Sequence, residues 1–306
     1  MNMKRVMRVL GVVVLGSVLA ACSKDDEPSS TVRLLNEVNS IDTYLASQNI
    51  TPIKDINGVR MVISKLGNGY PAKILSSTVS SSIDINYVGR LFPDGAQFDA
   101  GRATGALNGY IYGWKIAFTT LPEGSTARIY IPSGYAYGES GKGSISGNSI
   151  LEFDVTFNAI NRTNGELQRL GADTVAIDDY LALKGINAQR DSTGFRYVVT
   201  EEGSGPTPSL YHSVTLNITY KLLSDDSKII TQFDIAPNEQ TLNRPVDFIP
   251  DALKGALTKL KAGSKATIYA PSLLAFGVPG ATDGTNTIPA NANLIIEIKD
   301  LKIVDQ

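Results

Sequence analysis

Aromatic residues and one aspartate are the residues of this chain whose types and spacing are best suited to build a binding site. They lie between residues 87 and 153, and the set comprises Tyr87, Phe98, Asp99, Tyr110, Trp114, Tyr137 and Phe153. Rings grouped in this way can enclose a small apolar ring, exclude water from it and orient it through a few hydroxyl and carboxylate groups. Each ring taken alone is more often a core residue, so the alternative interpretation is a packed interior without a ligand.

The composition excludes most other kinds of site. The chain holds one histidine, His212, and one cysteine, Cys22. A zinc site built from Cys and His is therefore excluded, and a His-based catalytic triad has a single candidate histidine. His212 comes just before a predicted strand, where a lone histidine is usually a loop residue, and we assign it no role. The formal net charge of −2 gives no sign of the clustered basic face of a nucleic-acid-binding protein.

Alternating apolar and polar residues predict the strands that carry the rings. Ile83, Ile85 and Tyr87 alternate with polar residues, and residues 151–157 alternate in the same way, which is typical of half-buried antiparallel strands. The one clear helix predicted between these strands spans residues 114–121 and begins at the chain's only tryptophan. Several strands and one short helix indicate an α+β fold, in which we expect a sheet curled around the helix with the rings between them.

The same unit occurs twice. Residues 41–45 recur as residues 177–181, and residues 58–62 recur as residues 194–198, in both cases 136 residues later. A nearly constant offset across several motifs indicates a tandem duplication. We predict two domains, called the first repeat and the second repeat, over residues 32–163 and 164–306.

Helices at corresponding places support the duplication. Apolar residues at helical spacing predict a helix near residues 34–45 at the start of the first repeat and near residues 173–183 at the start of the second. The inner helix of the first repeat is matched by residues 252–261 in the second. The fold class is therefore two tandem α+β domains, each preceded by a short helix.

The first 31 residues predict the cellular location of the protein. Residues 1–21 have a basic start, an apolar run over residues 9–19 and small residues before Cys22, a pattern that resembles a bacterial lipoprotein signal. Cys22 would then carry the lipid that anchors the chain to a membrane. The alternative is an ordinary secretory signal with Cys22 as a bystander. Residues 22–31 read as a polar tether, in which Ser23 favours the outer membrane by resemblance to other lipoproteins.

Residues 25–27 of the tether are acidic. This cluster resembles the surface-export signal of Bacteroidota lipoproteins, and a solvated linker is the equal alternative. The cell surface and the periplasmic face therefore both remain open, as does the oligomeric state.

The order of the motifs resembles the FKBP-type peptidyl-prolyl cis-trans isomerase family. The resemblance covers about residues 58–163 and includes a strand tyrosine, a Phe-Asp pair, a Gly-Trp helix start, an Ile-Pro, an Ala-Tyr-Gly and a late Leu-x-Phe. These are Tyr87, Phe98-Asp99, Gly113-Trp114, Ile131-Pro132, Ala136-Tyr137-Gly138 and Leu151-Glu152-Phe153. The family fold is an antiparallel sheet curled around one helix, in agreement with the alternation.

The resemblance also implies the roles of individual residues. Trp114 would be the floor of a proline-binding pocket, Asp99 would lie at its rim, and the Tyr137 hydroxyl and the Ile111 N–H would donate to the substrate's carbonyls. The walls would be Tyr87, Phe98, Ile111, Ile145 and Phe153. The reaction implied is rotation about X-Pro bonds, which needs neither a nucleophile nor a metal or cofactor.

Two features of the first repeat depart from the family pattern. About five residues are missing after Phe98-Asp99, including a pocket phenylalanine, so that Gly105 falls near its place and one wall would be open. Arg102 is a candidate partner for Asp99. Tyr110 stands where the family has a smaller valine.

The second repeat departs further. It keeps Tyr220 and the pair Phe233-Asp234, which match Tyr87 and Phe98-Asp99 by residue type. The tryptophan is replaced by Ala252 or Leu253, the tyrosine of Ala-Tyr-Gly by Phe276, and the late phenylalanine by Ile296. We therefore expect the isomerase activity in the first repeat and a weak or inactive second repeat.

The sequence thus predicts a lipid-anchored isomerase that acts on X-Pro segments of envelope proteins, with no cofactor, no metal and no nucleic-acid partner. The alternative is a non-catalytic protein in which both repeats present a surface to a protein, peptide or glycan. A binding subunit of a nutrient-uptake system is a third interpretation, which rests on the lipid anchor alone.

Overall fold

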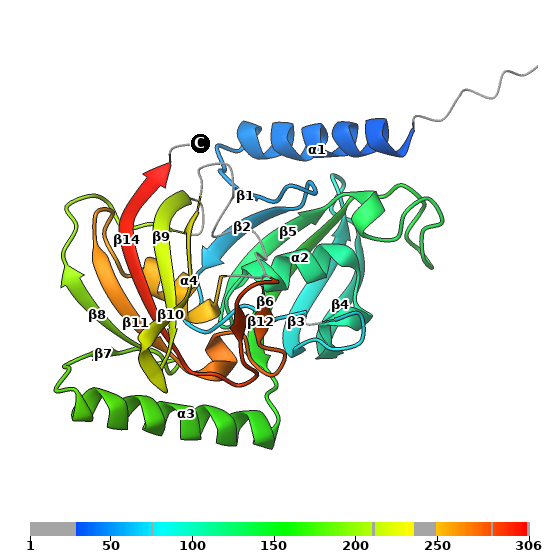
Figure 1. Ribbon diagram of the computed structural model, residues 1–306. Coiled ribbons are helices and arrows are strands. Elements are labelled where there is room, and N and C mark those ends of the chain that lie inside the picture. Colours follow the sequence, from blue (N-terminus) through cyan, green and yellow to red (C-terminus); the bar gives the residue numbers. More distant parts are fainter. Residues whose placement is uncertain (1–28, 75, 210–211, 236–248, 283, 305–306) are drawn as a thin grey trace, which may run out of the picture.

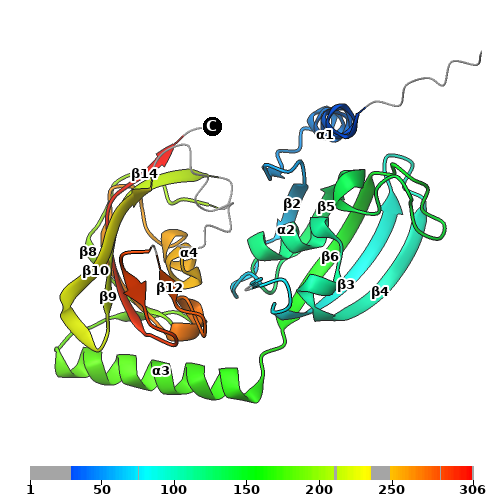
Figure 2. The same cartoon turned by 45° about the vertical axis from the view of Figure 1, so that its right-hand side comes forward.

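The computed structural model describes residues 29–74, 76–209, 212–235, 249–282 and 284–304. The predicted signal segment, Cys22 and most of the tether lie outside these described residues. The described chain forms two lobes, each built on one six-stranded antiparallel sheet (Figures 1 and 2).

The first lobe consists of six strands and two helices. The strands lie in the order β1-β2-β5-β6-β3-β4. Their bounds are β1 Ile53–Lys54, β2 Arg60–Lys65, β3 Ser82–Leu91, β4 Gln97–Ala106, β5 Thr126–Ile131 and β6 Leu151–Ile160. The helices are α1 Ser30–Ser47 and α2 Tyr112–Thr120, with single 3₁₀ turns η1 at Leu107–Gly109 and η2 at Ser133–Tyr135.

The second lobe repeats this arrangement. Its sheet has the order β7-β8-β11-β14-β9-β10, which is the order of the first sheet strand for strand. The bounds are β7 Gln189–Arg190, β8 Arg196–Glu201, β9 Ser213–Leu222, β10 Asp225–Ile235, β11 Lys265–Ala270 and β14 Leu294–Val304. The other elements are α3 Asn164–Leu183, α4 Asp251–Leu257, the turn η3 Ser272–Leu274 and the hairpin β12 Ala281–Thr282 with β13 Thr287–Ile288. The α+β fold class predicted from the sequence is confirmed.

Each sheet curls around its inner helix, and the core lies between them. In the first repeat, Ala117, Phe118 and Leu121 of the α2 segment pack against Ile85 of β3 and Phe157 of β6, and all five are buried. Burial of this apolar surface stabilises the fold by roughly 25 cal/mol per Å². This packing fixes the first turn of α2, which contains Trp114, over the sheet.

Helices α1 and α3 are attached to their sheets by the same polar contacts. Asp42 of α1 accepts two hydrogen bonds from Arg60 at 2.8 and 3.0 Å, and Asp178 of α3 accepts two from Arg196 at 2.9 and 3.0 Å. Helix α3 begins earlier than the predicted residue 173, because Thr163 caps it: the Thr163 hydroxyl accepts from the Glu166 N–H, and the Glu166 carboxylate accepts from the Thr163 N–H. In Figure 1, α1 lies along the first lobe and α3 along the second.

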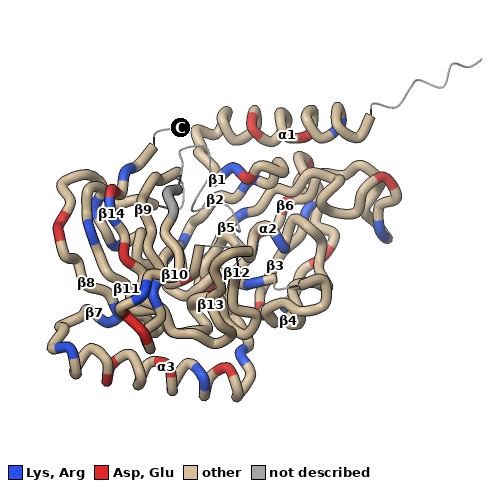
Figure 3. The backbone as a smooth tube through the Cα atoms, in the orientation of Figure 1, with Lys and Arg blue, Asp and Glu red and all other residues tan. Residues whose placement is uncertain are grey.

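The two lobes touch through the segment that joins β2 to β3. The Tyr70 side chain packs among buried residues of the second lobe, and its hydroxyl donates to the Thr193 hydroxyl. Lys73 lies 3.1 Å from a carboxylate oxygen of Asp251 at the start of α4. Its ammonium also donates to the carbonyl oxygens of Leu273 and Ala275, both at 3.1 Å. Figure 3 shows basic and acidic residues interspersed over both lobes in the described part of the chain.

Candidate functional site

Trp114 is the centre of an aromatic cluster in the first repeat. Its ring centroid lies 5.2 Å from those of Tyr87, Tyr110 and Phe153. The Phe98 ring lies 5.6 Å from Phe153 in an edge-to-face arrangement. These separations are in the favourable range for aromatic pairs, so the structure brings together five of the six rings that the sequence predicts.

Strand alternation aims these rings at one face of the sheet. Tyr87 and Gly89 lie two residues apart on β3 and share its inner face with Ile85, and Gly89 pairs with Phe153 of β6 and Asp99 of β4. A Cβ atom at Gly89 would lie 2.6 Å from Phe98 and 2.8 Å from Phe153. Glycine at this position is therefore required for the two phenylalanine rings to meet.

A tyrosine and a carboxylate form the polar edge of the cluster. The Tyr87 hydroxyl donates to Asp99 at 2.7 Å. Burial, and then the neighbouring Asp99 carboxylate, raise the pKa of Tyr87 to about 12. The hydroxyl therefore remains protonated and keeps the exposed Asp99 side chain in a fixed position.

Two further donors at the cluster are without acceptors. Ile111 is the residue before the first turn of α2, and its N–H has no hydrogen-bond partner among the described residues. The buried indole N–H of Trp114 likewise has no partner within the described chain. Buried donors without partners are rare in folded proteins, and the Trp114 indole N–H is one of them, three residues from the Ile111 N–H.

The remaining predicted site residues lie around the same core. Ile145 is buried in it, while Ile111 and Tyr137 pack against it and are partly exposed. Tyr137 follows the turn η2, and the Lys142 ammonium lies 5.2 Å from the centre of its ring. All eight predicted residues thus belong to the aromatic cluster or its surroundings.

The shortened segment of the first repeat is a regular hairpin. β3 and β4 pair continuously from Gly89 and Asp99 to Ser82 and Ala106. The Tyr110 hydroxyl approaches Gly105, since a Cβ built there would lie 3.5 Å from it. Tyr110 thus occupies the side where a ring was expected to be missing, and its burial raises its pKa.

The predicted contact between Arg102 and Asp99 is wrong. Arg102 pairs with Asn86 in the sheet, three positions from Asp99, and its guanidinium donates two hydrogen bonds to the Asp84 carboxylate, that from Nε at 2.8 Å. Hydrogen bonds from Arg102, and then from Asn158, hold the pKa of Asp84 at about 2. The pair lies on the outer face of the sheet, because Asp84 and Tyr87 fall on opposite faces of β3.

Helix α4 shows which residues of the second repeat stand at the equivalent positions. The N–H groups of Trp114 and Lys115 donate to the Ile111 carbonyl, and those of Leu253 and Lys254 donate to the Pro250 carbonyl. Leu253 therefore takes the place of Trp114, which resolves the two alternatives left by the sequence. Pro250 takes the place of Ile111 and has no N–H to donate, a loss that the sequence comparison missed.

The strand register corrects a second alignment. Ile296 occupies the position of Phe153, and the β9 residue opposite Ile296 is Tyr220, whereas the β3 residue opposite Phe153 is Gly89. Tyr220 therefore corresponds to Gly89, so the predicted match of Tyr220 with Tyr87 is wrong. Its fully buried ring lies 5.7 Å from that of Phe276.

The Phe-Asp pair of the second repeat is shifted along its strand. In the first repeat Asp99 pairs with Gly89. In the second, Asp234 pairs with Asn217, which lies three residues before Tyr220. Asp234, which the residue types match with Asp99, is therefore displaced along its strand from the position of Asp99, and the described register of the second repeat differs here from that of the first.

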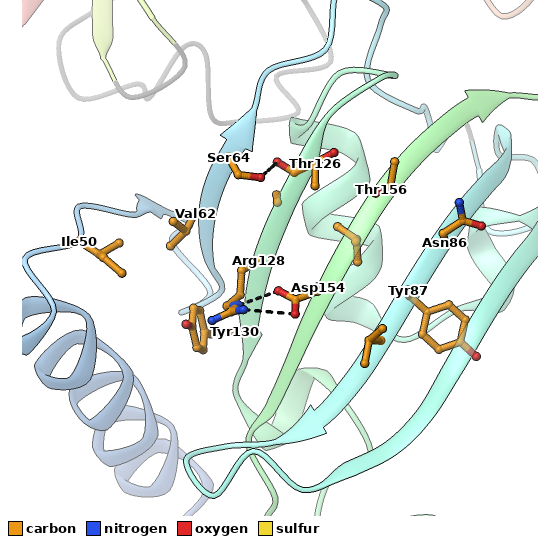
Figure 4. A pocket seen from close by; sticks show the side chains of 13 residues that line it. Ile50, Val62, Ser64, Asn86, Tyr87, Thr126, Arg128, Tyr130, Asp154 and Thr156 are labelled. Atoms are coloured by element: carbon orange, nitrogen blue, oxygen red, sulfur yellow. Dashed lines mark hydrogen bonds and ion pairs between the residues drawn. The ribbon is translucent and has the colours of Figure 1, made fainter.

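A separate groove of about 450 Å³ lies on the outer face of the first sheet (Figure 4). Its walls include Ile50 and Val62, and its floor carries Arg128 bound to Asp154 at 2.7 and 3.2 Å. The Tyr87 ring extends from the edge of this groove toward β4. None of the other predicted site residues lines it. Among the described residues, no group of three His, Cys, Asp or Glu side chains could hold a metal ion.

The fold and the aromatic cluster together define a class of protein. The model of the FKBP-type peptidyl-prolyl cis-trans isomerase family matches residues 76–158 and 205–300, one segment in each repeat. These segments make up more than half of the 306 residues, and the chain belongs to this family.

Individual relatives match shorter stretches. The FKBP-type isomerase FkpA of Aeromonas hydrophila is 35% identical over 111 residues, which are 35% of this chain and 39% of that protein. The isomerase Mip of Coxiella burnetii is 32% identical over 124 residues, 38% of this chain and 51% of that protein. The crystal structure of a peptidyl-prolyl cis-trans isomerase from Pseudomonas syringae shares 28% identity and a TM-score of 0.36, and it covers 44% of this chain and 98% of that one. The chain spans about half or less of the length of these two curated relatives.

Proposed function

We propose that the first repeat catalyses cis-trans isomerisation of X-Pro peptide bonds in protein clients. The observation that carries the proposal is the cluster around Trp114, with Asp99 and the unpaired Ile111 N–H at its edge. Membership of the FKBP-type family supports it.

The cluster suits this reaction because the barrier to rotation about the X-Pro bond comes from amide resonance. Rotation about the amide costs about 18–20 kcal/mol, since the planar bond has partial double-bond character. The twisted amide is less polar than the planar one, so a site walled by rings binds the twisted form better and lowers the barrier. No bond is broken and no group is transferred.

Each residue has a role in this proposal. The rings of Trp114, Tyr87 and Phe153 enclose the proline ring, and Phe98 adds a wall. The Ile111 N–H and the Tyr137 hydroxyl donate to carbonyl oxygens of the bound peptide, which fixes the chain on one side of the rotating bond. Asp99, held by Tyr87 at 2.7 Å, orients the peptide at the rim.

The second repeat has a non-catalytic role in the proposal. Pro250 cannot donate, Leu253 is smaller than tryptophan, and the Tyr220 ring stands where Gly89 leaves space in the first repeat. A repeat with this combination is better suited to bind protein than to isomerise it.

A proline-isomerisation assay on a short X-Pro peptide tests the proposal with the full chain. Trp114→Leu introduces the residue of the second repeat and should remove most of the activity. Leu253→Met changes the equivalent position with little change in volume and should leave the activity at the wild-type level. Equal rates for wild type and Trp114→Leu, with both proteins folded by circular dichroism, would refute the assignment.

We further propose that Cys22 carries lipid and anchors the protein in the bacterial envelope, most simply at the outer membrane. The support is the sequence of residues 1–31, which resembles a bacterial lipoprotein signal. Stable lipid anchoring takes two membrane-binding signals, such as two acyl chains, and a multiply acylated N-terminal cysteine supplies them. The clients would then be X-Pro segments of envelope proteins. None of the described helices is long and apolar enough to cross a membrane.

Fractionation of cells that express wild type or Cys22→Ala tests this localisation. Wild type should sediment with membranes and Cys22→Ala should be released. Membrane association that persists in Cys22→Ala would rule out the lipid anchor. For the membrane-bound wild type, protease treatment of intact cells distinguishes a protein on the cell surface from one on the periplasmic face.

A further inference from the structure

Helix α1 binds the turn η2, which comes just before Tyr137, the proposed hydroxyl donor of the isomerase site. The Glu37 carboxylate accepts a hydrogen bond from the Ser133 N–H at 2.7 Å and another from the Ser133 hydroxyl at 2.6 Å. Both residues are buried, and a buried carboxylate is stable only where such hydrogen bonds replace those to water. We call these two hydrogen bonds the α1–η2 contact.

The Ser133 carbonyl connects this contact to the backbone around Tyr137. It accepts hydrogen bonds from the Ala136 N–H and from the Gly138 N–H, both at 2.9 Å. These two residues flank Tyr137 in the sequence. The backbone on both sides of Tyr137 is therefore bound to the one residue that Glu37 holds.

The other end of this segment contacts the same helix. Arg33 lies one helical turn before Glu37, so the two side chains share a face of α1. The Arg33 guanidinium donates to a Glu139 carboxylate oxygen at 2.7 Å. Because the Glu139 side chain is 69% exposed, water and salt screen this pair, and it is the weaker of the two contacts. Residues 133–139 are thus bound to α1 at both ends, with Tyr137 between them.

Other residues attach α1 to its sheet without the help of Glu37. Ile41 and Leu45 of α1 are buried in an apolar cluster with two aromatic side chains of the first lobe. Asp42 accepts the two hydrogen bonds from Arg60 in the same part of the helix. Loss of the Glu37 carboxylate should therefore leave the helix in place and release the turn η2.

The second repeat has the equivalent contact but not the hydroxyl donor. Asp173 of α3 accepts from the Ser272 N–H at 3.0 Å and from the Ser272 hydroxyl at 2.5 Å. The Ser272 N–H also donates to the Asn293 side chain at 2.8 Å. The segment that follows carries Phe276, which has no hydroxyl. Asp173 is therefore the matched control for Glu37, since it makes the same contact in the repeat without the donor.

We propose that Glu37 is a positioning residue of the isomerase site, which acts through Ser133 to hold the Tyr137 hydroxyl where it donates to a carbonyl oxygen of the bound peptide. The inference deepens the proposed isomerase function and rests on it for the role of Tyr137. Glu37 lies before residues 76–158, the segment of the first repeat that matches the family model, so the family motifs do not indicate this role.

Isomerase kinetics of the full chain on a short X-Pro peptide test the route through Tyr137. Glu37→Ala removes both hydrogen bonds to Ser133 and should lower kcat/KM roughly two- to tenfold, the value of one hydrogen bond to a neutral group. The same change in a Tyr137→Phe background should cause no further loss, because the hydroxyl is already absent. Glu37→Gln keeps an acceptor for the Ser133 N–H and a donor for its hydroxyl, and it should stay within about twofold of wild type. Asp173→Ala should leave the activity unchanged.

Amide hydrogen exchange of the full chain, followed by NMR, tests the contact without reference to activity. The Ala136 and Gly138 amides should exchange at least about fivefold faster in Glu37→Ala than in wild type, because local opening of the turn costs less free energy. Ser133→Ala removes one of the two hydrogen bonds and should have a smaller effect in the same direction, which provides the test if Glu37→Ala does not fold. Asp173→Ala should leave exchange at both amides unchanged.

The outcomes separate the positioning role from the proposed function. Unchanged exchange at Ala136 and Gly138 in Glu37→Ala would overturn the positioning role, whatever the activity. Equal losses of kcat/KM from Glu37→Ala with and without Tyr137→Phe would also overturn it, because Glu37 would then act by another route. Absence of isomerase activity in wild type would overturn the proposed function and with it the catalytic role of the α1–η2 contact, whereas the exchange result would still decide whether the contact holds the backbone at Tyr137.

Discussion

Gly89→Ala is the substitution that tests the aromatic cluster most directly, because it adds a single methyl group between two rings. The added Cβ would lie 2.6 and 2.7 Å from atoms of Phe98 and 2.8 Å from Phe153. Ordinary carbon contacts are about 3.5–4.0 Å, so the rings must move by about 1 Å. Overpacking of this kind costs about 1–3 kcal/mol, and the smaller entropy of the unfolded alanine chain returns about 0.4–1 kcal/mol.

The expected net destabilisation is therefore about 0–2.6 kcal/mol, and the displaced rings should lower kcat/KM about 10- to 100-fold. Gly101→Ala is the matched control, because Gly101 pairs with Tyr87 in the same hairpin and has no atom within 4 Å of its Cβ position. This variant should be as active as wild type, and as stable or more stable by up to about 1 kcal/mol.

Urea unfolding followed by tryptophan fluorescence measures the stability of the first repeat within the full chain, because Trp114 is the only tryptophan. Isomerase activity on a short X-Pro peptide gives the second measurement. A wild-type midpoint and wild-type activity in Gly89→Ala would show that the rings are not packed against each other as described. Equal losses in Gly89→Ala and Gly101→Ala would assign the effect to the hairpin and not to the rings.

Three further predictions concern individual groups. Tyr137→Phe should lower kcat/KM roughly two- to tenfold, the value of one hydrogen bond to a neutral group, without shifting the urea midpoint. The pKa of Tyr87 is raised to about 12 in the folded chain against about 10 when unfolded. The stability that its neutral form contributes is therefore present below about pH 10 and is lost between about pH 10 and 12. This loss should be absent from Tyr87→Phe. Lys73→Met leaves the buried Asp251 carboxylate without its nearest cation and should destabilise the second repeat by roughly 2 kcal/mol, which is less than for a fully buried pair because Lys73 is partly exposed. A double-mutant cycle with Asp251→Asn, with unfolding followed by circular dichroism, should show that the two effects are coupled. Additive effects would contradict this prediction.

Local patterns were sufficient to predict the fold and the aromatic cluster of the first repeat, although not the partner of Arg102. Alternation over residues 83–87 and 151–157 fixed which side chains face the helix, and the order of the family motifs fixed which strands carry them. Together they predicted that Trp114, Tyr87 and Phe153 would meet, and the ring distances of 5.2 Å from Trp114 confirm this contact. The fold class followed from the same patterns, because one amphipathic sheet face and one short helix leave few ways to bury the apolar residues.

The alignment of the second repeat failed for a reason that lies in strand geometry. Tyr220 was matched with Tyr87 by residue type, whereas the register places it opposite Ile296, at the position of Gly89. The two positions differ by two residues and therefore face the same side of the sheet. Alternation detects a slip of one residue, which reverses the faces, but it cannot detect a slip of two. Register depends on pairing between strands distant in the sequence, so only the structure reveals it.

The start of the inner helix has different contacts in the two repeats. In the first repeat Tyr112 is 65% exposed and is followed two residues later by Trp114, so the first turn of α2 faces solvent on one side and the rings on the other. In the second repeat the equivalent residues are Asp251 and Leu253, and Asp251 is buried against Lys73 of the first repeat. A buried carboxylate is stable only with such a partner. Leu253 at the position of Trp114 is thus accompanied by Asp251, which fixes this turn against the neighbouring repeat, so the end of the helix that carries the aromatic cluster in the first repeat is a contact between domains in the second.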